Sequence, residues 1–390
     1  MAKSLLLHIG DPKTGSSSIQ EVMRNRLWVS PDVKVAYPEQ LNSFPLANAI
    51  SDPKQADQCE ARYSKLGEWL GMSDADADEA VVSAEQFFRV DPQALLDTLM
   101  HYVPAYVPGL RIVAYVRPHA SRFLSAFMQR TKAGMFQGDM ETFFARSRGE
   151  SLLYFAPRFD RWRAVFGDRF TLRPMIRSQL RDGDVVPDFL DLVVKGAPFT
   201  LRSTVQANPS LPLEYVTALR DIQTVLKRNT IQVGTRHAVG DHLGRALAAK
   251  FPGAGTKLQL SAALYEEIAA QCLPDAQALD AAFFDAPLMT QALTDAANDV
   301  TPASQPTDVA AHYSPEAVQT LRQSARKLVA MFKKRPGAWT VAYEREIGQR
   351  ITPPDATPPP PPVRMNIDRV NGVLADLTAT IGRLAGPQNP

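Results

Sequence analysis

The hydrophobic positions along the chain follow two different spacings. Short apolar runs rich in β-branched residues alternate with longer stretches in which apolar residues recur at helical spacing. This alternation predicts βαβ units, in which a parallel sheet carries helices on both faces. The strands are expected at residues 5–9, 33–37, 80–83, 111–116 and 169–172. The expected fold class is therefore α/β.

Helical spacing dominates from about residue 184 onward. Four stretches place apolar residues on one helical face: 185–190, 213–226, 261–272 and 314–332. Residues 285–308 are rich in Ala, Asp, Thr and Pro, and this composition predicts a loosely packed connection. The C-terminal region is therefore expected to be mainly helical.

The C-terminal end combines a proline run with a heptad pattern. Five consecutive prolines at 358–362 predict a stiff polyproline II spacer. Beyond them, apolar residues are spaced alternately three and four positions apart, at Ile367, Val370, Leu374, Leu377, Ile381 and Leu384. Such a seam fits either a coiled coil that joins copies of the chain or one amphipathic helix docked on its own domain. A seam of this length does not distinguish the two.

Composition and charge restrict the partners. The chain has 43 Lys and Arg against 41 Asp and Glu, a balance that gives no support for general nucleic-acid or anionic-membrane binding. We therefore expect no nucleic-acid partner and at most peripheral membrane contact. Any anion-binding site must therefore be local. The only cysteines, Cys59 and Cys272, are too few for a disulfide framework, and the apolar run near the N-terminus is too short for a signal peptide. A cytoplasmic protein is expected.

The segment HIGDPKTGSSSIQ, residues 8–20, has the glycine spacing of a phosphate-binding loop. Gly10 and Gly15 frame the loop, and an amphipathic helix is expected directly after it. A loop for ATP or GTP carries a lysine after the second glycine, but Ser16 stands there and Lys13 lies inside the loop. This position of Lys13 suits one phosphate that carries one further group better than it suits a triphosphate.

The stretch PKTGSSS resembles the 5'-phosphosulfate loop of sulfotransferases, usually written PKTGTT or PKSGTT. Bacterial members of this family are also similar in the HIG sequence that comes before the loop. Serines in place of the threonines keep the hydroxyl donors. The resemblance implies that the co-substrate is 3'-phosphoadenosine 5'-phosphosulfate (PAPS). It further implies that the loop binds the 5' end through Gly10, Pro12, Lys13, Thr14, Gly15, Ser16, Ser17 and Ser18.

A second segment, AYVRPHASRFLSAF, strengthens the resemblance. Arg117 ends an apolar strand, Ser125 follows eight residues later inside the expected helix, and Phe127 stands two positions beyond. The family binds the 3'-phosphate of its nucleotide with an arginine and a serine at this spacing, so Arg117 and Ser125 are the implied ligands. Arginine suits this role because its planar fork of donors matches a phosphomonoester. Arg122 is either a weaker companion of this pair or a solvated helix residue. His119 lies near the expected nucleotide and could contact it, but exposure to solvent is the favoured expectation.

The segment AVVSAEQFF places Glu85 just after an apolar run, where a parallel strand delivers residues to a ligand crevice. This setting is similar to the Ser-Ser-Glu strand end of bacterial sulfotransferases and to the catalytic Glu-x-x-Phe-Phe of polysaccharide-modifying members. Glu85 is therefore the candidate general base. Lys13 is the candidate group that stabilises the negative charge on the departing phosphate. This scheme requires no metal ion, and we assign no metal ligands.

The expected activity is transfer of a sulfuryl group from PAPS to a hydroxyl or amine of a saccharide, lipid or small-molecule acceptor. Two alternatives stay open: an ATP-dependent kinase with a P-loop fold, and a non-catalytic scaffold of the same fold that forms homo-oligomers through its heptads. Four parts are expected along the chain. They are a catalytic domain with a P-loop-type sheet at 1–284, a helical extension at 285–350, a Pro-rich linker at 351–363 and the heptad-patterned terminal helix at 364–390.

Overall fold

A computed structural model describes residues 4–73, 76–148, 151–203, 211–253, 255–350 and 357–384, except for the side chains of Ser151 and Leu384. Its contacts divide the chain into two units. Unit 1 consists of Met1–Arg122, Ser151–Ala207 and Ala269–Asp295, and unit 2 consists of Phe123–Glu150, Asn208–Ile268 and Ala296–Pro390. Helices α5 (His119–Lys132) and α11 (Ala262–Phe283) each begin in one unit and end in the other. These two units do not test the four-part division expected from the sequence, which stays a prediction.

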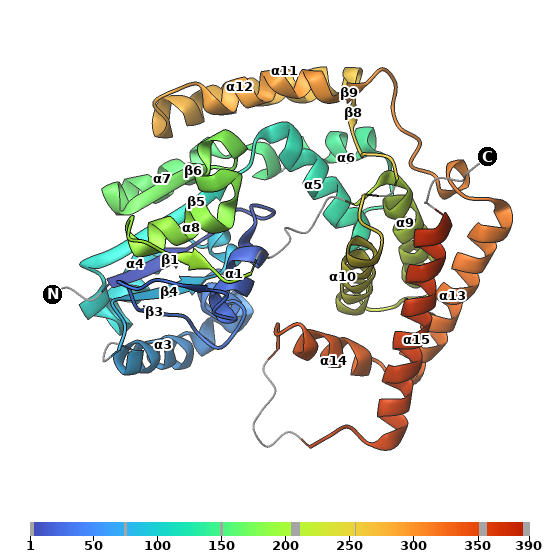
Figure 1. Cartoon of the computed structure of the whole chain (residues 1–390), viewed down its shortest axis with the longest axis horizontal. Helices are drawn as coiled ribbons and strands as arrows, with labels where there is room; N and C mark the ends of the chain where they lie inside the picture. The colour runs from blue at the N-terminus through green and yellow to red at the C-terminus, as the bar shows by residue number, and fades with distance from the viewer. Residues whose placement is uncertain are drawn as a thin grey trace. The chain divides into compact units, whose positions relative to one another are not determined.

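Unit 1 contains a five-stranded parallel sheet (Figure 1). Its strands, in order across the sheet, are β3 (Val35–Ala36), β4 (Glu79–Ser83), β1 (Ser4–His8), β5 (Gly109–Val116) and β6 (Phe170–Pro174). All five lie where the apolar runs predicted strands, although β3 is only two residues long. The expected α/β class is confirmed, with a parallel sheet, flanking helices and a helical C-terminal region.

Helices cover both faces of this sheet. On one face, α1 (Ser16–Arg24) and α8 (Val185–Val194) form a single buried cluster with Leu6, Val113 and Tyr115 of the central strands. Side chains alternate across a strand, so Leu5 and Leu7 point to the other face, where they are equally buried. There α7 (Ala156–Phe166) stacks aromatic rings on Phe170 of β6. Helix α4 (Pro92–Tyr102) contacts both α7 and α3 (Cys59–Ser73).

Smaller elements complete unit 1. Helix α2 (Phe44–Ser51) follows β3, and β2 (Trp28–Val29) pairs antiparallel with β7 (Thr200–Leu201). Helix α12 (Leu288–Asp295) falls within the stretch that we expected to be a loose connection, so this expectation is wrong for those residues. Met289 and Leu293 are buried there, because two apolar residues one turn apart anchor the helix despite its polar composition.

Unit 2 is mainly helical. Its described residues include part of α5 and of α11, a short parallel pair of β8 (Leu260–Ser261) and β9 (Val300–Thr301), and six further α-helices. These helices are α6 (Met140–Ser147), α9 (Leu213–Arg228), α10 (Val233–Lys250), α13 (Pro315–Lys334), α14 (Ala338–Glu346) and α15 (Pro361–Leu384). Helix α10 was not predicted. It crosses α5 so closely that a Cβ at Gly240 would lie 2.0 Å from the Lys132 carbonyl oxygen.

The heptad seam of α15 is buried within unit 2. Val370, Leu374, Leu377 and Ile381 are at most 1% exposed and share one apolar cluster with α9, α10 and α13. The docked amphipathic helix, one of the two alternatives for this seam, is therefore what the structure shows. Assembly of copies of the chain through the same seam stays a prediction.

The proline run is less of a spacer than expected. Residues 357–360 have no regular secondary structure, but Pro361 and Pro362 form the first turn of α15, so the helix begins before residue 364. Prolines are tolerated there because amides of a first helical turn have no intrahelical acceptor. Residues 351–356 of the expected linker lie outside the described residues. Across the described part of the chain, no helix combines the length and apolarity that a bilayer crossing needs.

Candidate functional site

Three neighbouring strands of unit 1 deliver the residues singled out by the sequence to one edge of the sheet. The loop 9–15 follows β1, Glu85 follows β4, and Arg117 follows β5. Strand pairing continues up to this edge, because the Ala84 amide donates to the His8 carbonyl at 3.0 Å. The chain leaves β1 toward β3 and β4 and later crosses to β5 on the other side, so the end of β1 is a topological switch point. Open parallel sheets bind ligands at such points.

The loop after β1 is held in an unusual backbone conformation. Gly10, Lys13 and Gly15 have φ angles of 46°, 72° and 84°. This left-handed region favours glycine, and Lys13 is one of five non-glycine residues with positive φ in the described ranges. Left-handed residues of this kind occur in anion-binding nests, in which successive backbone amides point to one concave side.

Packing explains why glycines frame this loop. A Cβ at Gly10 would lie 2.9 Å from the Ser16 hydroxyl and 3.1 Å from the Glu85 Cα. A Cβ at Gly15 would lie 2.5 Å from a methyl carbon of Val185 in α8. The two glycines therefore let the loop lie directly against Glu85, just after β4, on one side and against α8 on the other.

The loop ends at a helix terminus that offers hydrogen-bond donors. Gly15 is the N-cap of α1, so no side chain caps its first amides, and the first turn carries no acidic residue. The Ser16 hydroxyl is buried and has no hydrogen-bond partner among the described residues. Ser17 is exposed, whereas Ser18 is buried. An uncapped N-terminus with an unpaired hydroxyl is suited to a bound anion.

Thr14 and Pro12 shape the loop rather than line it with side-chain donors. The Thr14 side chain is fully buried, and its hydroxyl donates to the Asp11 carbonyl at 2.6 Å. This bond closes the turn around Lys13. Pro12 has no backbone N–H to offer. Among the expected loop ligands, these two residues therefore contribute conformation, and the donors come from Lys13, the backbone amides and the serines.

Glu85 is an acid with a perturbed environment. Burial raises its pKa above the ordinary value for glutamate. The Lys13 ammonium opposes this shift, and Asp11 adds to it. Glu85 and Lys13 are thus electrostatic neighbours, as the expected pairing of a base and a cation requires. A carboxylate with a raised pKa is a stronger base than a solvated one, a common property of functional acids.

Arg117 connects the two segments that carry the family resemblance. Its Nη1 donates to the Lys13 carbonyl at 3.0 Å, so the strand end of β5 and the loop after β1 touch. Burial lowers the pKa of Arg117, and the nearby Arg122 lowers it further. Two arginines beside one lysine concentrate positive charge at this edge of the sheet.

An ion-pair cluster beneath the loop was not predicted. Asp11 is fully buried, with Oδ2 2.9 Å from Arg122 Nε and Oδ1 2.7 Å from Arg158 Nη2. Arg122 is only 5% exposed, so its expected role as a solvated helix residue is wrong. Arg158 also lies over the rings of Phe88, Phe155 and Phe159. One loop carboxylate therefore ties the loop to α5 and α7.

His119 is likewise not where the sequence suggested. It is fully buried, and its Nε2 lies 2.9 Å from Asp275 Oδ2 of α11. Asp275 also accepts hydrogen bonds from the backbone amides of Phe155 and Ala156 at the start of α7. The expected solvent exposure is wrong because an acid distant in sequence supplies a buried partner. His8 is buried against Ser83, and burial lowers its pKa to about 3, so the ring is neutral.

Ser125 lies on the part of α5 that belongs to unit 2 and is partly buried. Within the ranges that the structure describes, no group of three or more His, Cys, Asp and Glu could hold a metal ion.

The fold and the site can be compared with known proteins. No family model matches this chain, and neither the curated proteins nor the solved structures give a significant match. Its functional interpretation therefore depends on the residues themselves. At one edge of its parallel sheet, this α/β protein brings together a positive-φ glycine loop, the half-buried Glu85 and Arg117.

Proposed function

We propose that this protein is a PAPS-dependent sulfotransferase with a P-loop-type fold. The hydrogen bond from Arg117 to the Lys13 carbonyl carries the proposal, because it joins the two motifs of the resemblance at one edge of the sheet. If the motifs lay far apart, one nucleotide could not bridge them. A cytoplasmic location is part of the same proposal.

The residues at this edge fit the two anionic ends of PAPS. The positive-φ loop, the uncapped start of α1 and the unpaired hydroxyl of Ser16 suit the 5'-phosphosulfate end. In this proposal Gly10, Lys13 and Gly15 to Ser18 hold that end, and Arg117 with Ser125 holds the 3'-phosphate. When bound, PAPS supplies the activated sulfuryl group.

The chain supplies the acid–base and electrostatic parts of the reaction. Glu85 takes the proton from the hydroxyl or amine of the acceptor, and its raised pKa makes it a more effective base. The Lys13 ammonium stabilises the negative charge that grows on the leaving phosphate. Asp11, held by Arg122 and Arg158, fixes the loop that carries Lys13 and is a positioning residue. No step in this scheme uses a metal ion.

The binding test compares nucleotides by their effect on thermal unfolding. We expect 3'-phosphoadenosine 5'-phosphate to raise Tm, with about 2.7 kcal/mol of stabilisation at a hundredfold excess over Kd. AMP, which lacks the 3'-phosphate, should stabilise less, and Arg117→Ala should remove the difference between the two nucleotides. Arg161→Ala is the matched control, because Arg161 is exposed and pairs only with Asp91 among the described residues.

Two results would overturn the proposal. Stabilisation by ATP with Mg²⁺ but not by 3'-phosphoadenosine 5'-phosphate would favour the kinase. Stabilisation by neither nucleotide would favour the scaffold without turnover.

The acceptor is identified by mass spectrometry of lipids and polysaccharides from cells that carry wild type or Glu85→Gln. A sulfated species present only with wild type is the expected product, since loss of a general base lowers turnover about 10²–10⁴-fold.

A further inference from the structure

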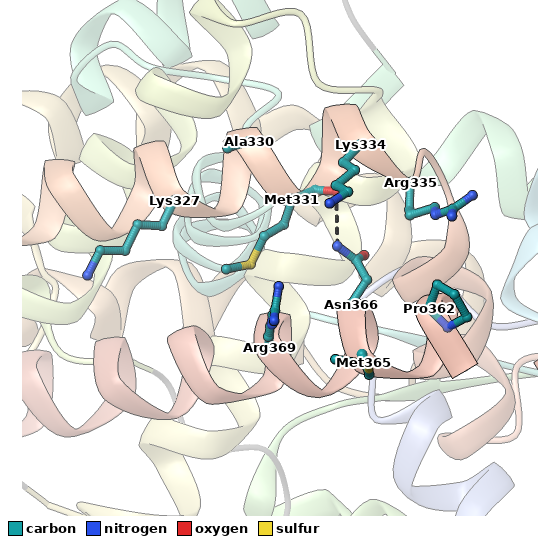
Figure 2. A pocket seen from close by; sticks show the side chains of 9 residues that line it. All are labelled: Lys327, Ala330, Met331, Lys334, Arg335, Pro362, Met365, Asn366 and Arg369. Atoms are coloured by element: carbon teal, nitrogen blue, oxygen red, sulfur yellow. Dashed lines mark hydrogen bonds between the residues drawn. The ribbon is translucent and has the colours of Figure 1, made fainter. Parts of the chain in front are cut away.

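The helices α13 and α15 of unit 2 form a groove that the sulfotransferase proposal does not use (Figure 2). Its volume is about 370 Å³, the size of a small ligand or a lipid headgroup. Four cations line it: Lys327 and Lys334 of α13, Arg335 directly after that helix, and Arg369 of α15. No salt bridge joins any of the four to a carboxylate of the described residues. The groove therefore has uncompensated positive charge.

Charge near the groove is far more one-sided than in the chain as a whole. Residues 326–335 and 361–372 contain seven Lys and Arg and one carboxylate, Asp368, whereas the whole chain is balanced to a net charge of +2. All seven cations are exposed. A dense cluster of exposed cations attracts anions through a field that salt screens, and the sequence requires any such site to be local.

The groove also has an apolar side. Met331 and Ala330 of α13 and Pro362 and Met365 of α15 line it, and Met365 is 55% exposed. Figure 2 shows the cationic side chains around these apolar ones, on the two facing helices. Flexible methionines accommodate irregular hydrocarbon groups. A simple inorganic anion gains nothing from contact with this apolar surface, whereas an anion with an attached hydrocarbon part can bury that part against it.

A buried polar group completes the groove. Asn366 is 8% exposed, and its Nδ2 donates to the Met331 carbonyl at 3.5 Å. Its Oδ1 is buried without a hydrogen-bond partner in the part of the chain that the structure describes. A buried acceptor without a partner is costly, and a hydroxyl or amine of a bound headgroup would satisfy it.

We propose that this groove binds the headgroup of an anionic phospholipid and so attaches unit 2 to a membrane surface. The phosphate contacts Lys334, Arg335 and the cations beside them, and the upper part of the hydrocarbon chains contacts Met331 and Met365. Basic pockets between helices and clusters of exposed Lys and Arg recognise anionic lipids in this way. Attachment of this kind is peripheral and depends on the local cluster of cations, because the near-neutral charge of the whole chain does not favour it.

The test is flotation of the full chain with lipid vesicles. Vesicles of phosphatidylcholine alone are compared with vesicles that contain roughly a quarter phosphatidylglycerol. We expect binding only to the second kind, weakened by added salt. Lys334→Gln should weaken partitioning about fivefold, and the double variant with Arg335→Gln about twenty-fivefold. Met365→Ser should also weaken vesicle binding, because it removes an apolar contact.

Lys333→Gln is the matched control. Lys333 is equally exposed and adjacent in sequence, yet it does not line the groove. Equal losses from Lys333→Gln and Lys334→Gln would show unlocalised surface attraction and overturn the site. If glycerol 3-phosphate displaced the protein from the vesicles as effectively as short-chain phosphatidylglycerol, the groove would be a site for free phosphate. Binding to polyglutamate without binding to anionic vesicles would show a protein-docking surface. Either result would overturn the lipid proposal.

Discussion

The two basic regions of this protein differ in the burial and in the pairing of their charged side chains. At the sheet edge of unit 1, the buried Arg122 and the half-buried Arg158 share the fully buried carboxylate of Asp11. In the groove of unit 2, Lys334, Arg335 and their neighbours are exposed and lack carboxylate partners among the described residues. The first arrangement fixes a loop in one conformation, and the second leaves a surface ready for an external anion.

This difference predicts different responses to change. A buried charge that loses its partner destabilises the fold, because its desolvation cost is no longer offset. An exposed charge contributes little to stability, so its loss affects binding instead. Salt separates the two as well, since it screens exposed charges far more than buried ones. The four predictions that follow use these contrasts.

Asp11→Ala should have the largest effect on stability. It leaves Arg122 and Arg158 without their shared carboxylate in a buried place, a change that typically costs about 3–5 kcal/mol. Urea unfolding measures the loss. Arg161→Ala is the control, because the exposed pair of Arg161 with Asp91 should contribute no more than about 1 kcal/mol. Similar losses from both variants would contradict the contrast between buried and exposed charge.

Asp275→Ala should have the next largest effect. Its carboxylate accepts from two backbone amides at the start of α7 and lies beside His119, so its removal leaves buried donors unsatisfied. We expect a loss of about 1–3 kcal/mol in the free energy of unfolding. Asp275→Asn should recover part of it, since the amide oxygen can still accept one backbone bond. No recovery by asparagine would show that the charge, rather than the hydrogen bonds, matters here.

The sequence predicted the elements whose signal is local. The five strands of the sheet, α8, α9 and α13 each carry an apolar pattern that leaves one interpretation, and each was found. Helix α10 was missed because small residues interrupt its apolar stripe, and Gly240 is there to admit α5. Helix α12 was missed because its two anchoring residues are outweighed by polar neighbours. A local hydrophobic pattern does not predict an element whose formation depends on packing against a distant segment.

The same rule applies to the candidate site. Gly10, Lys13, Gly15, Glu85 and Arg117 were singled out from motifs, and the strand order brings them to one edge. The cluster of Asp11, Arg122 and Arg158 was missed, since its members come from three segments and no spacing in the sequence connects them. The sequence did contain one signal for this cluster, because Asp11 stands inside the glycine loop. A buried carboxylate at that position requires cationic partners, which predicts arginines or lysines packed beneath the loop.

Glu85→Gln should stabilise the protein while it abolishes the proposed activity. Because the folded pKa of Glu85 lies above the unfolded value, the folded state binds the proton more tightly. The free energy of unfolding is therefore lowered as pH rises from the ordinary glutamate pKa through the raised one. The variant should lack this slope and gain on the order of 1 kcal/mol at neutral pH, as is common when a functional residue is replaced. Unfolding by urea at several pH values measures both; an unchanged slope in the variant would assign the titration to another group.

Lys334→Gln should have the smallest effect on stability. Its ammonium is exposed and has no carboxylate partner in the described residues, so unfolding should stay within about 0.5 kcal/mol of wild type. The sign is expected to be a slight gain at low salt, because removal of one of seven clustered cations relieves mutual repulsion. Physiological salt should abolish this gain by screening. Urea unfolding at low and at physiological ionic strength measures this change. Lys333→Gln is the control: it should change stability by the same small amount as Lys334→Gln, although the two variants differ in vesicle binding. A clear loss of stability from Lys334→Gln alone would mean that its ammonium has a structural partner, and the contrast between the two basic regions would then fail.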